Sequence, residues 1–230
     1  MEKISFRQEA HIAIVTMDRG ENRFNFSFFE EFNRVLDAVE TQSDASVMVV
    51  TSADRKVWSN GIDLDWLMTE IDKTGPDIGK QFMVEMYQFL KRILNFSMLT
   101  IASISGHAFG GGAFLSFAHD VRFMRSDRGW MCMPEVDINM TLGPVFMVLA
   151  KRAMPNDIFE EMQFTGVRMT ADDCVHHHIV RKSCHIDDLM NETLSFAKGL
   201  NKNRDVIAEM KKETHQEINL TIDNAIAAFQ

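Results

Sequence analysis

Three short stretches of the chain combine residue types that could act together on a carbonyl group. They are Ser59-Asn-Gly-Ile-Asp-Leu64, Ser105-Gly-His-Ala-Phe-Gly-Gly-Gly112 and Met133-Pro-Glu-Val-Asp-Ile138. The glycines of the second stretch separate a strand-like segment from a helix-like one, and the first amides of a helix have no backbone partner and a partial positive charge. Two such loops at strand ends could bind one carbonyl oxygen together and stabilise an enolate or a tetrahedral oxyanion.

An acidic residue stands where it could exchange a proton with a group held by these loops. Glu135 follows a short strand-like segment and Pro134, and a carboxylate at a strand end can serve as a general base. A surface or helix-start charge is the alternative for Glu135, and tight helix–sheet packing is the alternative for the glycines. Asp137 could hydrogen-bond backbone, orient a neighbour or act in catalysis, and His107 fits a packed histidine that holds loop backbone better than a base.

Composition excludes several classes of function. The 230 residues suit one globular domain, or one domain with a small helical appendage, and the formal net charge of −9 argues against a nucleic-acid binder. The three cysteines have no metal-like spacing and fit a reducing compartment. The sequence shows no signal-peptide pattern, no apolar run long enough for a membrane span and no C-terminal Ser-Lys-Leu, so we expect a cytoplasmic protein. His176-His177-His178 point in different directions on a helix, so we predict no metal site.

The elements that must position the three stretches follow the order of an α/β protein. Apolar patterns predict strands over residues 4–7, 11–17, 47–51, 99–104, 121–125, 130–133 and 179–184. Helical spacing predicts a helix that starts with Ser27 as its N-cap, and further helices over residues 78–96, 113–118, 144–165, 170–178, 186–200 and 203–228. Strand signals nearly vanish beyond Gly143, so we predict a core over residues 1–170 and a helical C-terminal region over residues 171–230.

Taken together, these motifs resemble the crotonase superfamily, the enoyl-CoA hydratase/isomerase family, over roughly residues 3–200. Asn22-Arg-Phe-Asn25, Asp120 before a strand, Pro134-Glu135 and Thr165-Gly166 join the two glycine loops in the family's order and spacing. Within the family the chain is most similar to the short Δ3,Δ2-enoyl-CoA isomerases, whose pattern Ser-Asn-Gly-x-Asp-Leu … Glu-x-Asp-Ile it matches.

The resemblance implies a fold, a substrate and a set of site residues. The fold would be a ββα spiral core with a helical trimerisation region, the substrate an acyl-CoA thioester without a further cofactor, and the assembly a homotrimer or a dimer of trimers. By resemblance the oxyanion amides fall on Ile62 and Gly111, and the catalytic acid on Glu135. The substrate-binding positions are Arg23, which matches a position that meets the CoA phosphates, Ser59, Gly61, Asp63 and Phe114. Asp63 also fits an N-cap of the next helix, and Arg55 and Lys56 are either CoA contacts or solvated surface charges.

One departure from the family pattern bears on the reaction. The first acid of the hydratases would lie two residues after the glycines, where this chain has Phe114. A single base suits an isomerase, which moves a proton from the α- to the γ-carbon and shifts a 3-enoyl-CoA to the 2-trans isomer through a dienolate. Burial beside an apolar wall would raise the pKa of Glu135 toward a useful range. Hydration, decarboxylation or thioester hydrolysis, and an acyl-CoA-binding protein without catalysis, are the alternatives.

Overall fold

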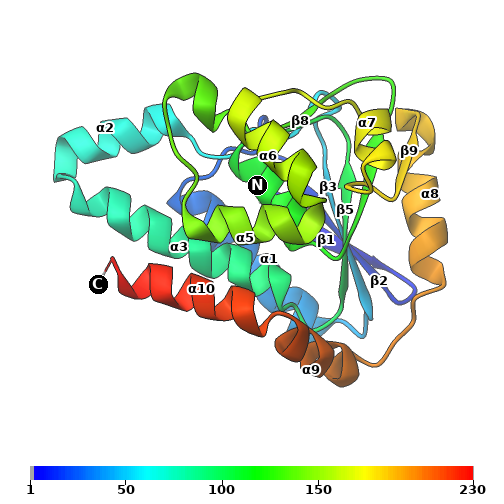
Figure 1. The fold of residues 1–230 in the computed structure, drawn as a ribbon. Helices are drawn as coiled ribbons and strands as arrows, with labels where there is room; N and C mark the ends of the chain where they lie inside the picture. Colours follow the sequence, from blue (N-terminus) through cyan, green and yellow to red (C-terminus); the bar gives the residue numbers. More distant parts are fainter. Residues whose placement is uncertain (1–2, 230) are drawn as a thin grey trace.

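The largest element of the computed structural model, which describes residues 3–229, is a six-stranded sheet (Figure 1). Its strands are β1 (Ile4–Glu9), β2 (Ile12–Met17), β3 (Val47–Ser52), β5 (Leu99–Ile104), β7 (Val121–Arg125) and β9 (Lys182–Cys184), in the order β1-β2-β3-β5-β7-β9. The β1–β2 hairpin is antiparallel and all other neighbours are parallel. The predicted strands are therefore confirmed, although β9 starts later than expected. The predictions for residues 1, 2 and 230 lie outside the described residues.

Both faces of this sheet are covered, which explains its continuous apolar strands. Along β3, Met48 and Val50 face the larger core, to which α1 (Phe26–Gln42) and α3 (Asp77–Leu94) contribute. The alternate residues Val47 and Val49 face a smaller cluster closed by α8 (Ile186–Lys198). In Figure 1 α8 lies on one side of the sheet, and α1 and α3 lie on the other. The α/β prediction is confirmed, with a helical layer on each face.

A second, three-stranded parallel sheet brings the chemically interesting stretches together. Its strands are β4 (Val57–Ser59), β6 (His107–Phe109) and β8 (Met131–Cys132), in the order β4-β6-β8. Since the carboxyl ends of parallel strands meet at one edge, the three stretches that follow these strands become neighbours. The strand β6 was not predicted, because three residues between Gly106 and Gly110 form a strand only when β4 and β8 flank them.

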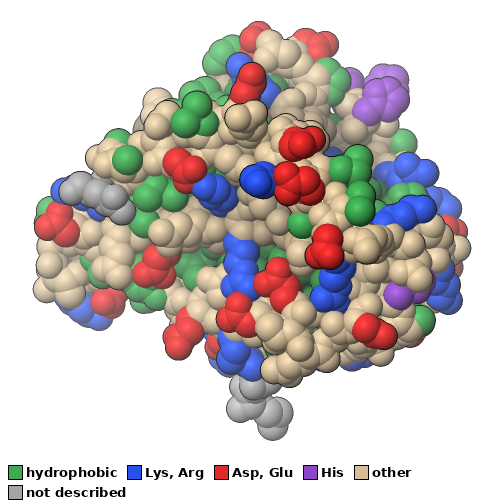
Figure 2. All heavy atoms as spheres, turned by 90° about the horizontal axis from the view of Figure 1, so that it is seen from below, with side chains coloured by type: hydrophobic (Ala, Val, Ile, Leu, Met, Phe, Trp, Pro, Cys, Tyr) green, Lys and Arg blue, Asp and Glu red, His purple; other side chains and the backbone are tan. Residues whose placement is uncertain are grey.

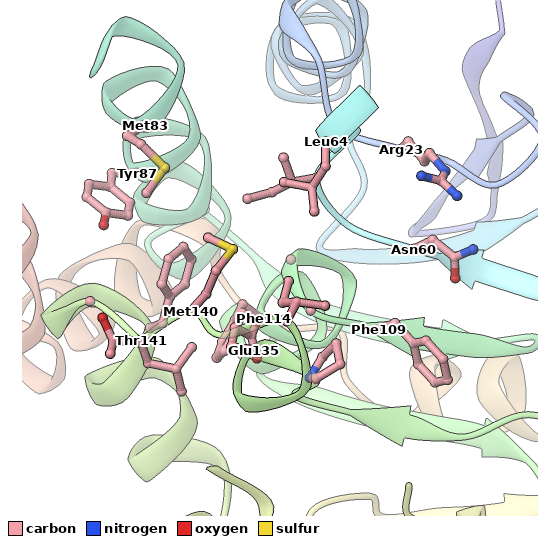
Figure 3. Close-up of a pocket in the computed structure, with 18 residues that line it drawn as sticks. Arg23, Asn60, Leu64, Met83, Tyr87, Phe109, Phe114, Glu135, Met140 and Thr141 are labelled. Carbon is pink, nitrogen blue, oxygen red and sulfur yellow. The ribbon is translucent and has the colours of Figure 1, made fainter. Parts of the chain in front are cut away.

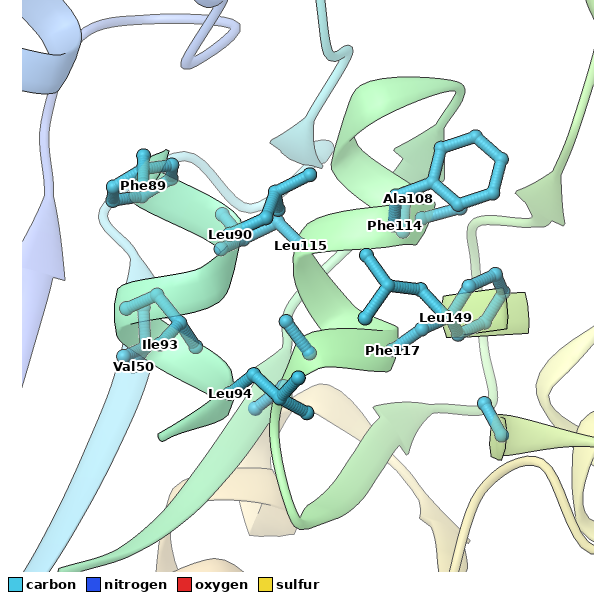
Figure 4. Packing of buried hydrophobic residues seen from close by; sticks show 14 of the residues in the cluster. Val50, Phe89, Leu90, Ile93, Leu94, Ala108, Phe114, Leu115, Phe117 and Leu149 are labelled. Atoms are coloured by element: carbon cyan, nitrogen blue, oxygen red, sulfur yellow. The ribbon is translucent and has the colours of Figure 1, made fainter. Parts of the chain in front are cut away.

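The remaining helices enclose this edge. They are α2 (Leu64–Thr74), α4 (Gly111–Ala118), α5 (Pro144–Ala153), α6 (Asn156–Thr165), α7 (Ala171–His176), α9 (Arg204–Thr214) and α10 (Gln216–Ala227), with a 3-10 turn, η1 (Glu135–Ile138). All residues of α4 are buried, and α4 packs against both α3 and α5 (Figure 4). The last helix, α10, packs on α5 and α3, so the C-terminal part of the chain supports the same layer.

The N-terminus of α1 differs from the prediction. Asn25, not Ser27, is the N-cap: its side chain accepts a hydrogen bond from the amide of Phe28, and its backbone is extended, with φ −146°. Ser27 is already the second helical residue, and its hydroxyl donates to Asn25 Oδ1. Asparagine is at least as good an N-cap as serine, so the correction moves the start of the helix without changing its buried face.

Two predicted continuous helices are each broken into a pair. The helix predicted over residues 144–165 is interrupted at Pro155, which has no amide hydrogen and forces the preceding residue into an extended conformation. The helix predicted over residues 203–228 is interrupted at His215, whose ring is buried and accepts a hydrogen bond from Arg152 Nε at 3.3 Å. The first break follows from local chemistry and the second from a tertiary contact.

Ion pairs connect α9 to the sheet and α3 to α1. Lys211 Nζ lies 2.6 Å from Asp120 Oδ2 and donates to the carbonyl of Met98, which ties α9 to the sheet. On the face shown in Figure 2, acidic and basic side chains alternate, in keeping with surface pairs such as that of Arg92 and Asp37. Within the described residues no helix has the length and apolar character needed to cross a membrane.

Candidate active site

A cavity of about 470 Å³ opens at the carboxyl edge of the small sheet (Figure 3). The loops after β4, β6 and β8 form one part of its wall, and α3, α4, α5 and the segment before α5 form another. Arg23, between β2 and α1, and Leu64, at the start of α2, complete the wall. Its lining residues are Arg23, Asn60, Ile62, Leu64, Met83, Tyr87, Phe109, Gly110, Gly111, Phe114, Pro134, Glu135, Ile138, Met140, Thr141, Leu142, Gly143 and Phe146. Of the eight site positions that the sequence indicated, five therefore meet in one cavity: Arg23, Ile62, Gly111, Phe114 and Glu135.

Two backbone amides in the cavity wall are unpaired. The amides on either side of Ile62 are both engaged, since Gly61 N–H donates to Ser59 Oγ and Asp63 N–H donates to the carbonyl of Phe24. Gly111 is the first residue of α4, so its N–H has no intrahelical acceptor. Among residues 3–229, no group accepts a hydrogen bond from the amide of Ile62 or Gly111.

These two amides come close because glycines let the loops touch. A Cβ atom on Gly61 would lie 2.4 Å from the backbone nitrogen of Gly111, and Gly61 has a φ of +70°. A Cβ atom on Gly112 would lie 2.1 Å from the carbonyl oxygen of Ser59. Contacts this short exclude any side chain, so glycine at these two positions is required by close backbone approach.

Three of the predicted substrate-binding residues support the loop from outside the cavity wall. The fully buried Ser59 donates its hydroxyl hydrogen to the carbonyl of Asn22 at 2.8 Å and accepts the amide of Gly61 at 3.1 Å. Asp63 caps α2 by accepting the amide of Trp66 at 3.3 Å, as its position before the helix predicted. Ser59, Gly61 and Asp63 thus hold the Ile62 amide in place from behind.

The carboxyl group of Glu135 is held in a poorly solvated position. Glu135 opens η1, and its Oε1 lies 3.5 Å from the point where a Cβ on Gly110 would stand. Its Oε2 is buried and has no hydrogen-bond partner in the part of the chain that the structure describes. Burial raises the pKa of Glu135, opposed in part by a backbone hydrogen bond. A carboxylate in this environment is a stronger base than one in water.

An aromatic wall stands beside this carboxyl group. Phe114 is fully buried, and its ring centroid lies 4.6 Å from that of Phe146 and 5.8 Å from that of Phe117. Sequence reasoning found Phe114 but assigned no site role to Met83, Tyr87 or Phe146. Met83 and Tyr87 are four residues apart on α3, a spacing that shows a shared buried face without telling whether it meets a core or a cavity.

Basic residues are placed unequally around the cavity. Arg23 lines it, with its side chain 39% exposed and its Nε 2.6 Å from the carboxylate of Glu21, whose pKa it lowers. Arg55 pairs instead with Asp187 on the exposed surface, and neither Arg55 nor Lys56 lines the cavity. The structure thus separates Arg23 from the other two basic candidates.

Three further candidates of the sequence lie outside the cavity wall. His107 Nδ1 accepts the amide of Trp130 at 3.3 Å, which fits the expected role in holding loop backbone. The carboxylate of Asp137 rests against Gly166, where a Cβ would lie 2.7 Å from Oδ2. In residues 3–229 no three His, Cys, Asp or Glu side chains converge on a point where a metal ion could bind, and His176-His177-His178 are included in that range.

The fold and the cavity define a protein of the enoyl-CoA hydratase/isomerase class. The sequence matches the family described as Enoyl-CoA hydratase/isomerase over residues 7–229, so the chain belongs to this family and is an enzyme of the crotonase type. This confirms the resemblance and the fold class that the sequence indicated.

The curated relatives include both isomerases and hydratases. The chain is 32% identical to enoyl-CoA delta isomerase 2, peroxisomal, of Arabidopsis thaliana over 168 residues, which cover 72% of this chain and 70% of that protein. It is 23% identical to the short-chain-enoyl-CoA hydratase of Clostridium acetobutylicum over 230 residues, covering 99% of this chain and 86% of that one.

Solved structures share the fold along almost the whole chain. An enoyl-CoA hydratase/isomerase family protein from Pseudomonas syringae superposes with a TM-score of 0.89 at 21% identity and covers 98% of this chain, which covers 96% of that chain. A probable enoyl-CoA hydratase from Mycobacterium tuberculosis gives a TM-score of 0.88 at 18% identity, with coverages of 98% and 93%. At these identities the likeness establishes the fold alone.

Proposed function

We propose that the protein converts a 3-enoyl-CoA into the 2-trans-enoyl-CoA with Glu135 as its single acid–base group. The observation that carries this proposal is that Glu135 is the sole carboxyl side chain among the described residues that line the cavity. A hydratase of this family would need a second acid at position 114, where the chain has a buried phenylalanine. The names of the Arabidopsis relatives support the same reaction.

In the proposed complex the thioester oxygen accepts hydrogen bonds from the amides of Ile62 and Gly111. Both amides lack a hydrogen-bond partner among residues 3–229 and belong to loops in direct contact, so they can point to one oxygen. Donors fixed in this way stabilise the negative charge that develops on the oxygen. In other enzymes, removing one such donor raises the activation free energy by roughly 3–4 kcal/mol. The acyl chain would then extend along the wall of Phe114.

The proton moves in two steps. The Glu135 carboxylate takes a proton from C2, and the electron pair of that C–H bond delocalises through C1 onto the thioester oxygen and through the C3–C4 double bond. The resulting dienolate takes the same proton back from Glu135 at C4, which leaves the double bond between C2 and C3. Atoms and charge balance without a further cofactor. The aromatic wall of Phe114 and Phe146 keeps water from the dienolate, and the raised pKa of Glu135 helps it both to remove and to return the proton.

The wider context of the reaction follows the family. We propose an acyl-CoA thioester as the substrate, with Arg23 near the CoA phosphates and Ser59, Gly61 and Asp63 supporting the binding loop. We further propose a homotrimer or a dimer of trimers, and a cytoplasmic location, which the free thiols of Cys132, Cys174 and Cys184 support.

The test is the variant Glu135→Gln, which keeps the shape of the side chain and removes its basicity. With 3-hexenoyl-CoA as substrate, kcat should fall by about 10²- to 10⁴-fold, while the dissociation constant of a saturated acyl-CoA should change by less than about twofold. Asp137→Asn is the matched control, because Asp137 lies two residues away and outside the cavity wall, and it should retain wild-type kcat.

Full isomerase activity in Glu135→Gln would contradict the proposal. A second measurement separates the alternative reactions: the wild-type protein is incubated with 2-enoyl-CoA in water and its products are resolved by chromatography. Formation of 3-hydroxyacyl-CoA or of free CoA at rates comparable to isomerisation would replace the one-base isomerase by a hydratase or a thioesterase. A decarboxylase would be recognised in a separate incubation with a malonyl-type thioester, which carries the carboxylate that leaves as CO2.

A further inference from the structure

A buried tyrosine presents its hydroxyl group to one end of the cavity. It is Tyr87 on α3, the single tyrosine of the chain, whose side chain lines the cavity although the residue is only 3% exposed. No group in residues 3–229 forms a hydrogen bond with its Oη atom. The hydroxyl faces the cavity, so a ligand that fills this end displaces water from it and must either pair with the hydroxyl or leave it without a partner, which is unfavourable.

The Tyr87 ring is fixed on several sides, so the hydroxyl cannot swing out to solvent. Its centroid lies 5.6 Å from that of Phe146 on α5 and 6.2 Å from that of Phe229, which follows α10. A Cβ on Gly143 would stand 3.1 Å from Oη, so the hydroxyl rests against the N-terminus of α5. Burial also raises the pKa of Tyr87, which keeps the phenol protonated and able to donate near neutral pH.

This hydroxyl lies at the opposite end of the cavity from the basic side chain. In Figure 3 Arg23 and Asn60 lie at one end and Tyr87 and Thr141 at the other, with Glu135 and Phe114 between them. The hydroxyl oxygens of Tyr87 and Thr141 point toward one another in this view.

The wall between the two ends is apolar. In Figure 3 Leu64, Phe114 and Met140 lie between the two ends, and Leu142 and Phe146 also contribute apolar lining to the cavity. A thioester held beside Glu135, with its CoA portion toward Arg23, would therefore direct its acyl chain along hydrocarbon until it reached the two hydroxyls.

We propose that the preferred acyl chain carries an oxygen function, a hydroxyl or a carbonyl, at the position that reaches Tyr87. The proposal rests on the proposed function for the placement of the thioester, and it adds the class of acyl group. A plain alkyl end displaces water from the Tyr87 hydroxyl and leaves it unpaired, whereas an oxygenated end accepts its hydrogen. Sites that are built to pair a polar group discriminate against the analogue that lacks one.

The experiment compares saturated acyl-CoA ligands, which cannot be isomerised, so that binding is measured independently of the reaction. Pairs of ω-hydroxyacyl-CoA and n-acyl-CoA of equal length, from six to twelve carbons, are titrated by calorimetry. At the length that reaches Tyr87, the hydroxylated ligand should bind about five- to tenfold more tightly, the effect of one neutral hydrogen bond. Thr141→Val should reduce this ratio less than a change at Tyr87 does.

The variant Tyr87→Phe keeps the ring and its aromatic contacts and removes only the oxygen. It should invert the preference, because the n-acyl ligand no longer strands a hydroxyl while the ω-hydroxyl now lacks a partner. Met83→Leu, one turn earlier on the same lining face of α3, is the matched control and should change both affinities alike, leaving their ratio within twofold of wild type.

Because Tyr87 is the single tyrosine, a label at its ζ-carbon gives one NMR signal in the unmodified protein, which provides a test even if the variant folds poorly. The signal should shift more with the hydroxylated ligand than with its n-acyl partner. The proposal is overturned if n-acyl ligands bind as tightly as their hydroxylated partners at every length, or if Tyr87→Phe leaves the ratio unchanged. If the wild-type protein preferred the hydroxylated ligands as expected but did not isomerise a 3-enoyl-CoA, only the proposed function would be overturned.

Discussion

The cavity has two halves built in different ways. One half is backbone: the loops after β4 and β6 press together so closely that Gly61 and Gly112 leave no room for a Cβ atom. The other half is side chain: Glu135, Phe114 and Tyr87 project from three separate elements, η1, α4 and α3. In the proposed reaction, the backbone half would supply fixed amide donors that suit any acyl thioester, and the side-chain half would decide which proton moves and which acyl group fits.

The two halves also respond to pH in opposite directions. Behind the backbone half, fully buried His119 packs its ring 6.1 Å from that of Trp58 on β4, and burial lowers its pKa to about 4 despite a hydrogen bond with the Leu115 carbonyl and the nearby Asp120. Stability that depends on neutral His119 is lost as pH falls from about 6.5 toward 4. In the side-chain half, burial raises the pKa of Glu135, and the pH dependence has the opposite sign because the charged form of a carboxyl group is the deprotonated one, which forms as pH rises.

The largest effect should come from placing a side chain in the backbone half. In Gly112→Ala the new Cβ would stand 2.1 Å from the Ser59 carbonyl oxygen. Relieving this overlap must separate β4 from α4 and should cost about 3 kcal/mol or more, lowering Tm by roughly 6–12 °C in a chain of this size. Calorimetry measures the loss, and isomerisation should fall with it because the Ile62 and Gly111 amides move apart.

Gly199→Ala is the matched control for this change. The nearest atom to its Cβ would be the Phe196 carbonyl oxygen at 3.6 Å, an ordinary contact, and its φ of −80° suits any residue. Its Tm should stay within about 2 °C of wild type, since the substitution meets neither overlap nor strain. Equal Tm values for the two variants would show that the glycine loops are not the tightly packed half of the site.

A smaller effect, of opposite sign, is expected in the side-chain half. Glu135→Gln should raise Tm at pH 7 by about 1–3 °C, because it removes a buried charge whose Oε2 has no hydrogen-bond partner among the described residues. The folded-state pKa of Glu135 is raised, so the wild-type protein loses stability as pH rises from about 4.5 through that pKa. The gain in the variant should therefore vanish below about pH 4.5. Melting curves measured across this range test the sign, and a Tm that drops at pH 7 would mean that the charged carboxylate has a stabilising partner.

The difference between the halves also explains what the sequence could predict. Glycines, capping residues and prolines act on the backbone next to them in the sequence. The loops around Ile62 and Gly111 and the Asp63 cap can therefore be predicted from neighbouring residues. The interruption at Pro155 has an equally local cause, although the helical pattern alone predicts a continuous helix there. Tyr87 could not be found in this way, because helical spacing marks a buried face without showing whether atoms or a cavity lie opposite. The same holds for His215, where a contact with Arg152, not a local signal, ends a helix.

The smallest effect concerns the rim, where Arg23 would meet the phosphates of CoA. Its guanidinium is 39% exposed and already paired with Glu21, so solvent screens its attraction for an anion. Arg23→Gln should therefore raise KM for an enoyl-CoA only about three- to tenfold at low salt, with kcat unchanged, and the effect should shrink as salt is added. An enoyl-pantetheine substrate, which lacks the nucleotide phosphates, should bind the variant and the wild type equally.

Arg55→Gln, which breaks an exposed pair with Asp187 away from the cavity, is the control. It should leave the KM values for the enoyl-CoA and for the enoyl-pantetheine unaltered. If Arg23→Gln raised KM equally for the enoyl-CoA and the enoyl-pantetheine substrate, Arg23 would lie beside the acyl portion of the substrate. The backbone half and the side-chain half of the cavity would then meet at a charged residue.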